Sequence, residues 1–177
     1  MPYVQVGRSQ IHFVEQGPSL ASHLPPIVFI HGAGGSHQMW LQQLGVLGRR
    51  RRAIAVDLPG HGDSNGSGAD PIEAYCDIVR GFITALGLDR IVMVGHSMGG
   101  AITQSIALAY PGLLAAIVLA GTGVRLRVQP QILAALRGDA RRAVEMIAKL
   151  VYVSGTPAEV LKQDAAKAGN GKKGKKK

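Results

Sequence analysis

The chain has 177 residues, and with 46% hydrophobic and 18% charged residues its composition is that of a soluble globular protein. A single cysteine excludes an internal disulfide framework, and neither a signal peptide nor an apolar run of ~20 residues is visible, so we expect a cytoplasmic protein without a membrane segment. The net charge of +9 does not indicate specific nucleic-acid binding, because five lysines among the last six residues supply more than half of it.

The predicted elements begin with residues 2–6 and 11–16, which alternate apolar and polar side chains on either side of a turn. This alternation predicts a β-hairpin with one solvent-facing side. Continuous apolar runs, typical of strands buried on both faces, follow at residues 26–30, 52–56, 90–94 and 113–120. Between these runs the apolar residues have helical spacing, at residues 36–47, 71–86 and 101–110.

The second of these helices has clear boundary signals. Asp70 is expected to be its N-cap and Pro71 its first residue, since proline lacks the N–H that a first turn leaves unpaired. Strands separated by helices require right-handed crossovers. We therefore predict an α/β fold with a mostly parallel sheet of about six strands, an antiparallel first hairpin and helices on both faces.

After Gly123 the pattern changes to helical segments without an intervening strand. These segments are expected at residues 130–137, 139–152 and 157–168. The predicted organisation is an α/β core over residues 1–124, a partial helical cap over residues 125–168 and a disordered lysine- and glycine-rich tail over residues 169–177.

One motif carries chemistry. Gly95-His96-Ser97-Met98-Gly99 has the pattern G-x-S-x-G, and it lies between a predicted buried strand and a predicted helix. A strand-to-helix turn this tight strains the backbone at the serine and needs small residues two positions away on each side. It would lift the Ser97 hydroxyl above the sheet edge, at a helix N-terminus that favours negative charge.

With this motif the chain resembles the α/β-hydrolase superfamily, in its serine esterase-like branch with a helical cap. Two further motifs carry the resemblance in the family's order, namely His31-Gly32-Ala33-Gly34-Gly35 and Asp57-Leu58-Pro59-Gly60-His61-Gly62-Asp63-Ser64. The resemblance runs to about residue 165 and implies two strands beyond the sixth, so we expect a truncated hydrolase sheet whose last strand, 113–120, is an exposed edge.

The resemblance also implies roles for individual residues. Ser97 matches the nucleophile, and the backbone amides of Ala33 and Met98 match the oxyanion hole. Gly32 and His96 are expected to contact the substrate. A serine rather than an aspartate at this position implies acyl transfer, and we expect a small carboxylic ester as substrate. No cofactor and no metal site is expected, because the glycine loop lacks the spaced G-x-G-x-x-G of a dinucleotide site and no ligand cluster is evident.

The residues that would activate the serine are missing from the sequence. In this fold the order is serine, then acid, then histidine. All six histidines lie before Ser97, and none follows it. His31 is expected to brace the oxyanion loop and His61 to cap a turn. Asp57 and Asp63 are expected to fix turns through their own backbone.

Two hypotheses remain open from the sequence. The first is a serine hydrolase, inactive or strongly impaired without its histidine. The second is a non-catalytic folded unit that interacts with other molecules or with itself. Because an apolar edge strand invites pairing, we expect that residues 113–120 are covered by a second copy or by the helices after residue 129.

Overall fold

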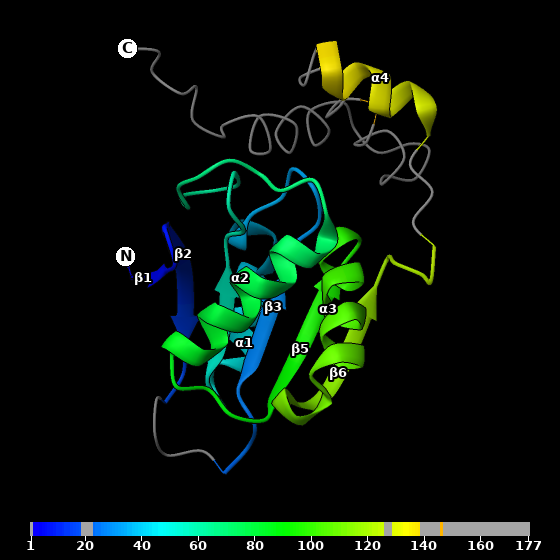
Figure 1. The fold of residues 1–177 in the computed structure, drawn as a ribbon. Coiled ribbons are helices and arrows are strands. Elements are labelled where there is room, and N and C mark those ends of the chain that lie inside the picture. Colours follow the sequence, from blue (N-terminus) through cyan, green and yellow to red (C-terminus); the bar gives the residue numbers. More distant parts are fainter. Residues whose placement is uncertain (1, 19–22, 126–128, 139–145, 147–177) are drawn as a thin grey trace. The chain divides into compact units, whose positions relative to one another are not determined.

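The computed structural model describes residues 2–18, 23–125, 129–138 and 146. It divides into two units, Met1–Leu126 and Arg127–Lys177, which are described separately. The first unit holds a six-stranded sheet with the order β1-β2-β4-β3-β5-β6 (Figure 1). The strands are β1 (Tyr3–Val6), β2 (Ser9–Gln16), β3 (Ile27–Ile30), β4 (Ala53–Val56), β5 (Ile91–His96) and β6 (Leu114–Ala120).

The sheet is mostly parallel, as predicted. The hairpin β1-β2 is antiparallel, and β2 also runs antiparallel to β4. The pairs β3-β4, β3-β5 and β5-β6 are parallel. Since the connections after β3, β4 and β5 all leave from the carboxyl ends of parallel strands, the three family motifs meet at one edge of the sheet.

Helices cover both faces of the sheet. On one face lie α2 (Ile72–Ala85) and α3 (Met98–Ala109), and on the other lie the 3₁₀ turn η1 (His37–Trp40) and α1 (Leu41–Leu47), as Figure 1 shows. A second 3₁₀ turn, η2 (Pro111–Leu113), leads from α3 into β6. In the second unit the structure describes one helix of several residues, α4 (Pro130–Gly138).

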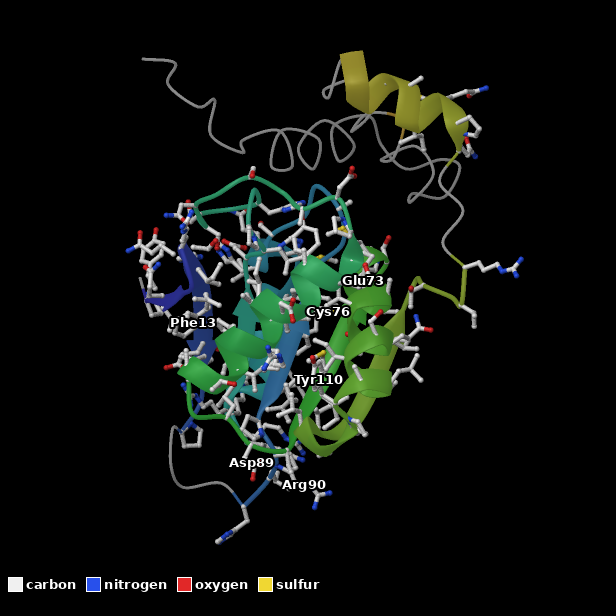
Figure 2. The ribbon with its side chains drawn as sticks, in the orientation of Figure 1. Phe13, Glu73, Cys76, Asp89, Arg90 and Tyr110 are labelled. Atoms are coloured by element: carbon white, nitrogen blue, oxygen red, sulfur yellow. The ribbon has the colours of Figure 1, made fainter. Side chains whose placement is uncertain are left out.

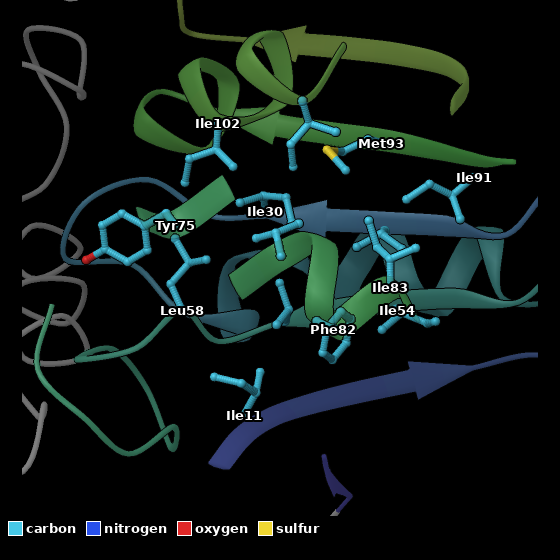
Figure 3. Packing of buried hydrophobic residues seen from close by; sticks show 14 of the residues in the cluster. Ile11, Ile30, Ile54, Leu58, Tyr75, Phe82, Ile83, Ile91, Met93 and Ile102 are labelled. Carbon is cyan, nitrogen blue, oxygen red and sulfur yellow. The ribbon is translucent and has the colours of Figure 1, made fainter. Parts of the chain in front are cut away.

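The two faces bury separate core clusters because side chains alternate along each strand. In β3, Val28 and Ile30 join the larger cluster beneath α2 and α3, whereas Ile27 and Phe29 join the smaller cluster beneath α1. Figure 3 shows the larger cluster, in which Phe82 and Ile83 of α2 and Ile102 of α3 lie on strand residues including Ile54, Ile91 and Met93. These buried strands explain the uninterrupted apolar runs in the sequence.

Two boundary predictions need correction. Pro71, with extended backbone angles (φ −82°, ψ 141°), is itself the N-cap of α2, so Asp70 lies outside the helix and makes no side-chain cap. The helix expected from residue 101 begins at Met98, because the turn at Ser97 passes directly into α3. The helices expected at residues 139–152 and 157–168 and the tail at 169–177 lie outside the described residues.

The single cysteine, Cys76, packs in the larger core cluster. It lies on α2 facing α3, with its Sγ 3.8 Å from the Ile102 carbonyl oxygen (Figure 2). Burial raises the pKa of this thiol, which opposes its ionisation. Asp89 and Arg90 mark the opposite end of β5 from Ser97, as Figure 2 shows.

β6 is an edge strand, as the sequence predicted. It pairs with β5 alone among the described strands, and its residues Ala115 to Leu119 are exposed. No helix in the described part of the chain is long and apolar enough to cross a membrane.

Candidate active site

The turn between β5 and α3 has the backbone that the G-x-S-x-G pattern predicts. Ser97 adopts φ 51° and ψ −116°, a positive φ that few residues other than glycine tolerate. A Cβ on Gly95 would collide with the Gly99 carbonyl oxygen and with Oγ1 of Thr103. A Cβ on Gly99 would collide with the Ile30 carbonyl oxygen. The two glycines are therefore required because β5, α3 and the end of β3 come too close for any side chain.

Backbone hydrogen bonds hold Ser97 in this strained conformation. Its N–H donates to the Ala120 carbonyl at 3.0 Å, which ties the turn to the end of β6. Its carbonyl accepts from the N–H groups of Gly100, at 2.9 Å, and Ala101, at 3.2 Å. Ser97 is thus the N-cap residue of the 12-residue helix α3, where the helix dipole favours a developing negative charge.

The loop after β3 lies against this turn. A Cβ on Gly32 would stand 3.1 Å from the Ser97 Cβ and 3.1 Å from Nδ1 of His96. The loop closes on itself through a 3.0 Å hydrogen bond from Gly35 N–H to the Gly32 carbonyl, with Gly34 at φ 72°. The structure therefore brings Gly32 to His96 and Ser97, although Gly32 is far from this pair in the sequence.

The two amides predicted to form the oxyanion hole are unpaired. Within the described residues, neither the Ala33 N–H nor the Met98 N–H donates to a protein acceptor. Ala33 is exposed and Met98 is the first residue of α3, a position whose N–H has no partner within the helix, so both donors are available for a ligand oxygen.

His31 braces the loop, as predicted. Its Nε2 accepts the Leu58 N–H at 3.0 Å, so the proton of the neutral ring resides on Nδ1, which donates to the Gly32 carbonyl at 2.8 Å. Burial lowers the pKa of His31 from 6.5 to about 4, although the bond to Gly32 opposes this shift. His31 is therefore neutral at pH 7 and acts as a hydrogen-bonding strut.

Two side chains near the start of α3, His96 before Ser97 and Thr122 against Gly100, have unpaired polar atoms. Nδ1 of His96 and Oγ1 of Thr122 are buried and have no hydrogen-bond partner among the described residues. Burial lowers the pKa of His96, which keeps its ring neutral. A neutral imidazole nitrogen and a hydroxyl without partners can bind a polar group of a ligand.

The buried carboxylate of Asp57, after β4, accepts hydrogen bonds from several groups, of which the sequence predicted only the turn contact. We call Asp57, His12 and His37 the hub. The carboxylate accepts the Asp63 N–H at 2.9 Å, which is the expected turn contact. It also accepts Nδ1 of His12 at 2.9 Å, the N–H of His37 at 2.6 Å and Nδ1 of His37 at 2.9 Å. These partners lie 45 and 20 residues away in the sequence, and no local spacing predicts them.

The bond between Asp57 and His37 shifts the pKa of both groups. Burial alone would raise the pKa of Asp57, but the hydrogen bonds from His37 and from the Asp63 amide outweigh it and lower the pKa from 3.8 to about 2. The same bond to Asp57 raises the pKa of His37 against the effect of its burial. With Asp63, these residues form the one cluster in the described part of the chain whose donor atoms, within 4.8 Å of one another, could surround a metal ion. No such cluster was expected from the sequence.

His61 makes the turn contact that the sequence predicted. The sequence offers no histidine where the catalytic base of the family is expected. Nδ1 of His61 lies 3.0 Å from the Pro59 carbonyl, so this residue caps its turn as expected. No histidine follows Ser97 in the sequence. The carboxylates that do follow it lie outside the described residues, at Asp139, Glu145, Glu159 and Asp164.

Comparison with known proteins agrees with this geometry. The model of the alpha/beta hydrolase fold family matches residues 25–157. The chain therefore belongs to the α/β-hydrolase superfamily.

Individual relatives are partial matches. The chain is 32% identical over 114 residues to an uncharacterised protein of Mycobacterium tuberculosis, covering 64% of this chain and 33% of that one. It is 33% identical over 104 residues to (E)-2-((N-methylformamido)methylene)succinate hydrolase of Acinetobacter baylyi, covering 58% and 38%. The structure of Est816, an N-acyl homoserine lactone degrading enzyme, matches with a TM-score of 0.80 at 25% identity, over 94% of this chain and 64% of Est816. The chain thus spans about a third of the length of the Mycobacterium tuberculosis and Acinetobacter baylyi relatives.

Proposed function

We propose that Ser97 is the nucleophile of an acyl-transfer site that acts on small carboxylic esters. The observation that carries this proposal is the strained turn at Ser97, held by three backbone hydrogen bonds next to two unpaired amides. Strain of this kind persists where the surrounding structure imposes it, and it is concentrated at functional sites.

The proposed chemistry follows from the donors around Ser97. Its Oγ attacks the ester carbonyl carbon, the Oγ–H proton passes to a base, and the carbonyl oxygen becomes an oxyanion. The N–H groups of Ala33 and Met98 stabilise this oxyanion, each by ~3 kcal/mol. Collapse of the intermediate breaks the ester C–O bond and releases the alcohol, leaving an acyl group on Ser97 that water then removes. His96 and Gly32 are proposed to contact the substrate.

The base is the weak point of the site. Since no histidine follows Ser97 in this sequence, we propose that the chain by itself transfers acyl groups slowly. Loss of the histidine of such a triad lowers kcat by about 10⁶-fold. The oxyanion hole and substrate binding would provide the remaining rate enhancement.

The substrate class is supported by one structural neighbour. Est816 degrades an N-acyl homoserine lactone, and a lactone is an internal ester. We propose that residues 125–168 are a partial helical cap. We also propose a cytoplasmic location, in keeping with a single, buried and unpaired cysteine.

The test is acylation of the full chain by p-nitrophenyl acetate, followed by mass spectrometry of its peptides. We expect one acetyl group on Ser97 and slow release of nitrophenol, and we expect neither in Ser97→Ala. Ser105→Ala is the matched control, because Ser105 lies on α3 as well and should leave acetylation unchanged. Equal nitrophenol release by the wild type and Ser97→Ala, without an acetylated Ser97, would refute the proposal.

A second candidate role rests on a different observation. The apolar residues Ile117, Val118 and Leu119 of β6 are 39%, 49% and 42% exposed, and in the described part of the chain this strand pairs with β5 alone. We propose that two copies associate through β6, since an exposed apolar edge strand is a template for pairing. Sedimentation velocity should then show a concentration-dependent dimer, and a monodisperse monomer at all concentrations would refute this role.

A further inference from the structure

The loop His31–Ser36 carries one of the two proposed oxyanion amides, that of Ala33, and its path decides where that amide points. The loop contains three glycines, so its own sequence imposes little stiffness. Removing a single oxyanion donor lowers a rate by about 10²- to 10³-fold, so small displacements of this loop matter. Some other part of the molecule has to hold it.

Two adjacent residues after β4 hold the two ends of this loop, Leu58 at the beginning and Asp57 at the end. At the first end, the Leu58 N–H donates to Nε2 of His31, at 3.0 Å. At the other end, the Asp57 carboxylate accepts the N–H of His37 at 2.6 Å and Nδ1 of the same residue at 2.9 Å. Asp57 and Leu58 are fully buried, so water does not compete for these bonds.

Asp57 is itself fixed by groups outside the loop. Its N–H donates to the His12 carbonyl at 2.9 Å, and its carboxylate accepts Nδ1 of His12 at 2.9 Å and the Asp63 N–H at 2.9 Å. Its carbonyl accepts Oγ–H of Ser64 at 2.7 Å. The carboxylate therefore has a fixed position even without the loop, and a residue that positions the loop needs such a fixed position.

We infer that Asp57 is a positioning residue for the oxyanion loop and that His37 is the side chain through which it acts. This inference rests on the proposed function, because it assigns a task to the loop of the same site. Asp57 does not touch the reacting atoms. It sets the end of the loop, as the Leu58 amide sets the beginning, and so holds the Ala33 N–H in place.

His12 provides a matched comparison within the hub. His12 and His37 are both buried, and each places Nδ1 2.9 Å from the same Oδ2 atom of Asp57. His37 is joined to the loop by the chain, whereas His12 lies on β2. Loss of either ring leaves a buried carboxylate short of one donor, so both losses destabilise the fold. Only the loss of the His37 ring should loosen the loop, which then keeps the backbone bond from the residue 37 N–H as its sole attachment to Asp57.

The experiment uses His37→Ala, His37→Asn and His12→Ala in the full chain, each checked for folding by circular dichroism. The first measurement is amide hydrogen exchange of Ala33 to Gly35 by NMR, which needs no reaction at Ser97. The second is the rate of Ser97 acetylation by p-nitrophenyl acetate. His37→Ala should exchange at least about tenfold faster in the loop. It should also acetylate between about 10- and 100-fold more slowly.

The other two variants separate positioning from stability. His37→Asn should recover most of both values, since its amide can reach the Asp57 carboxylate from the position of Nδ1. His12→Ala should lower Tm about as much as His37→Ala but leave loop exchange and acetylation at wild-type values. Loop exchange unchanged in His37→Ala, or equally raised in His12→Ala, would overturn the inference. Absence of acetylation in the wild type would count against the proposed function alone, because loop exchange is measured separately.

A metal ion is the competing explanation of the hub, and the same proteins test it. One equivalent of Zn²⁺ should leave the Tm and the loop exchange of the wild type unchanged, since four donor groups already satisfy the Asp57 carboxylate. A rise in Tm with one equivalent of Zn²⁺, absent from His12→Ala and His37→Ala, would show that the cluster is a metal site. It would overturn the inference that Asp57 positions the oxyanion loop.

Discussion

The neighbouring strands β5 and β6 have similar sequences and opposite surroundings. Both are continuous apolar runs, and they pair in parallel with Val94 directly opposite Val118. Val94 is 9% exposed and packs in the smaller core cluster, whereas Val118 is 49% exposed. The difference comes from position in the sheet, because β5 has a strand on each side and β6 has a neighbour on one side only among the described strands.

This comparison shows where the structure places its constraints. The strained serine, the required glycines and the buried hub all lie at the ends of interior strands or beside them. β6 contributes one backbone acceptor to the site, the Ala120 carbonyl. Substitutions and changes of pH should therefore act mainly through the interior strands, and the following predictions test that difference.

The largest expected effect on stability is that of acid, and it should act through the loops after β3 and β4. These loops carry titratable side chains, whereas β6 carries none. His31 has a pKa of about 4 in the fold against 6.5 unfolded, so the unfolded chain takes up this proton first and stability falls from pH 6.5 to 4 by about 3 kcal/mol. Asp57 contributes stability above pH 3.8, and about 2 kcal/mol is lost as pH falls through about 2.

Urea unfolding at several values of pH measures both losses. His37 acts in the opposite sense: its raised pKa contributes stability at low pH that is lost as pH rises through that pKa. His31→Gln should remove most of the slope between pH 6.5 and 4. An unchanged slope in this variant would contradict the neutral, buried state of His31.

The next effect concerns two helical glycines. Gly99→Ala should cost up to about 3 kcal/mol, because the new methyl group meets the carbonyl oxygens of Ile30 and His31, which are backbone atoms. Gly45→Ala on α1 is the control. Nothing lies within 4 Å of its Cβ position, so this change should stabilise the protein by about 1 kcal/mol. Denaturant midpoints of both variants decide whether α3 is held against β3 as closely as described.

The paired valines test the strand comparison directly. Val94→Ala removes two buried carbon atoms from the smaller core cluster and should cost about 2 kcal/mol. Val118→Ala, the same change on the opposite residue, should cost about 0.5 kcal/mol. Equal losses in urea unfolding at low protein concentration would mean that β6 is covered in the isolated chain.

The smallest change in stability is expected for Val118→Lys. A charged side chain on an edge strand opposes pairing with another strand, so this variant should remain monomeric in sedimentation while unfolding within about 0.5 kcal/mol of the wild type. A dimer of unchanged affinity would place the contact between copies elsewhere.

The sequence by itself determined the order of strands and helices and the strained turn at Ser97. These features depend on local physics: alternating or continuous apolar residues set strand burial, and a serine between glycines sets a tight turn. Helix ends were less predictable, since Pro71 and not Asp70 caps α2.

Only the tertiary structure decided the contacts around Asp57 and the exposure of individual β6 side chains. His12, Asp57 and His37 meet because three separate connections reach one end of the sheet, and no periodicity in the chain records such a meeting. The tautomer of His31 likewise depends on the Leu58 amide, 27 residues away. The edge position of β6 was expected, but the exposure of Val118 against the burial of Val94 depends on the strands that neighbour each residue in the described part of the chain.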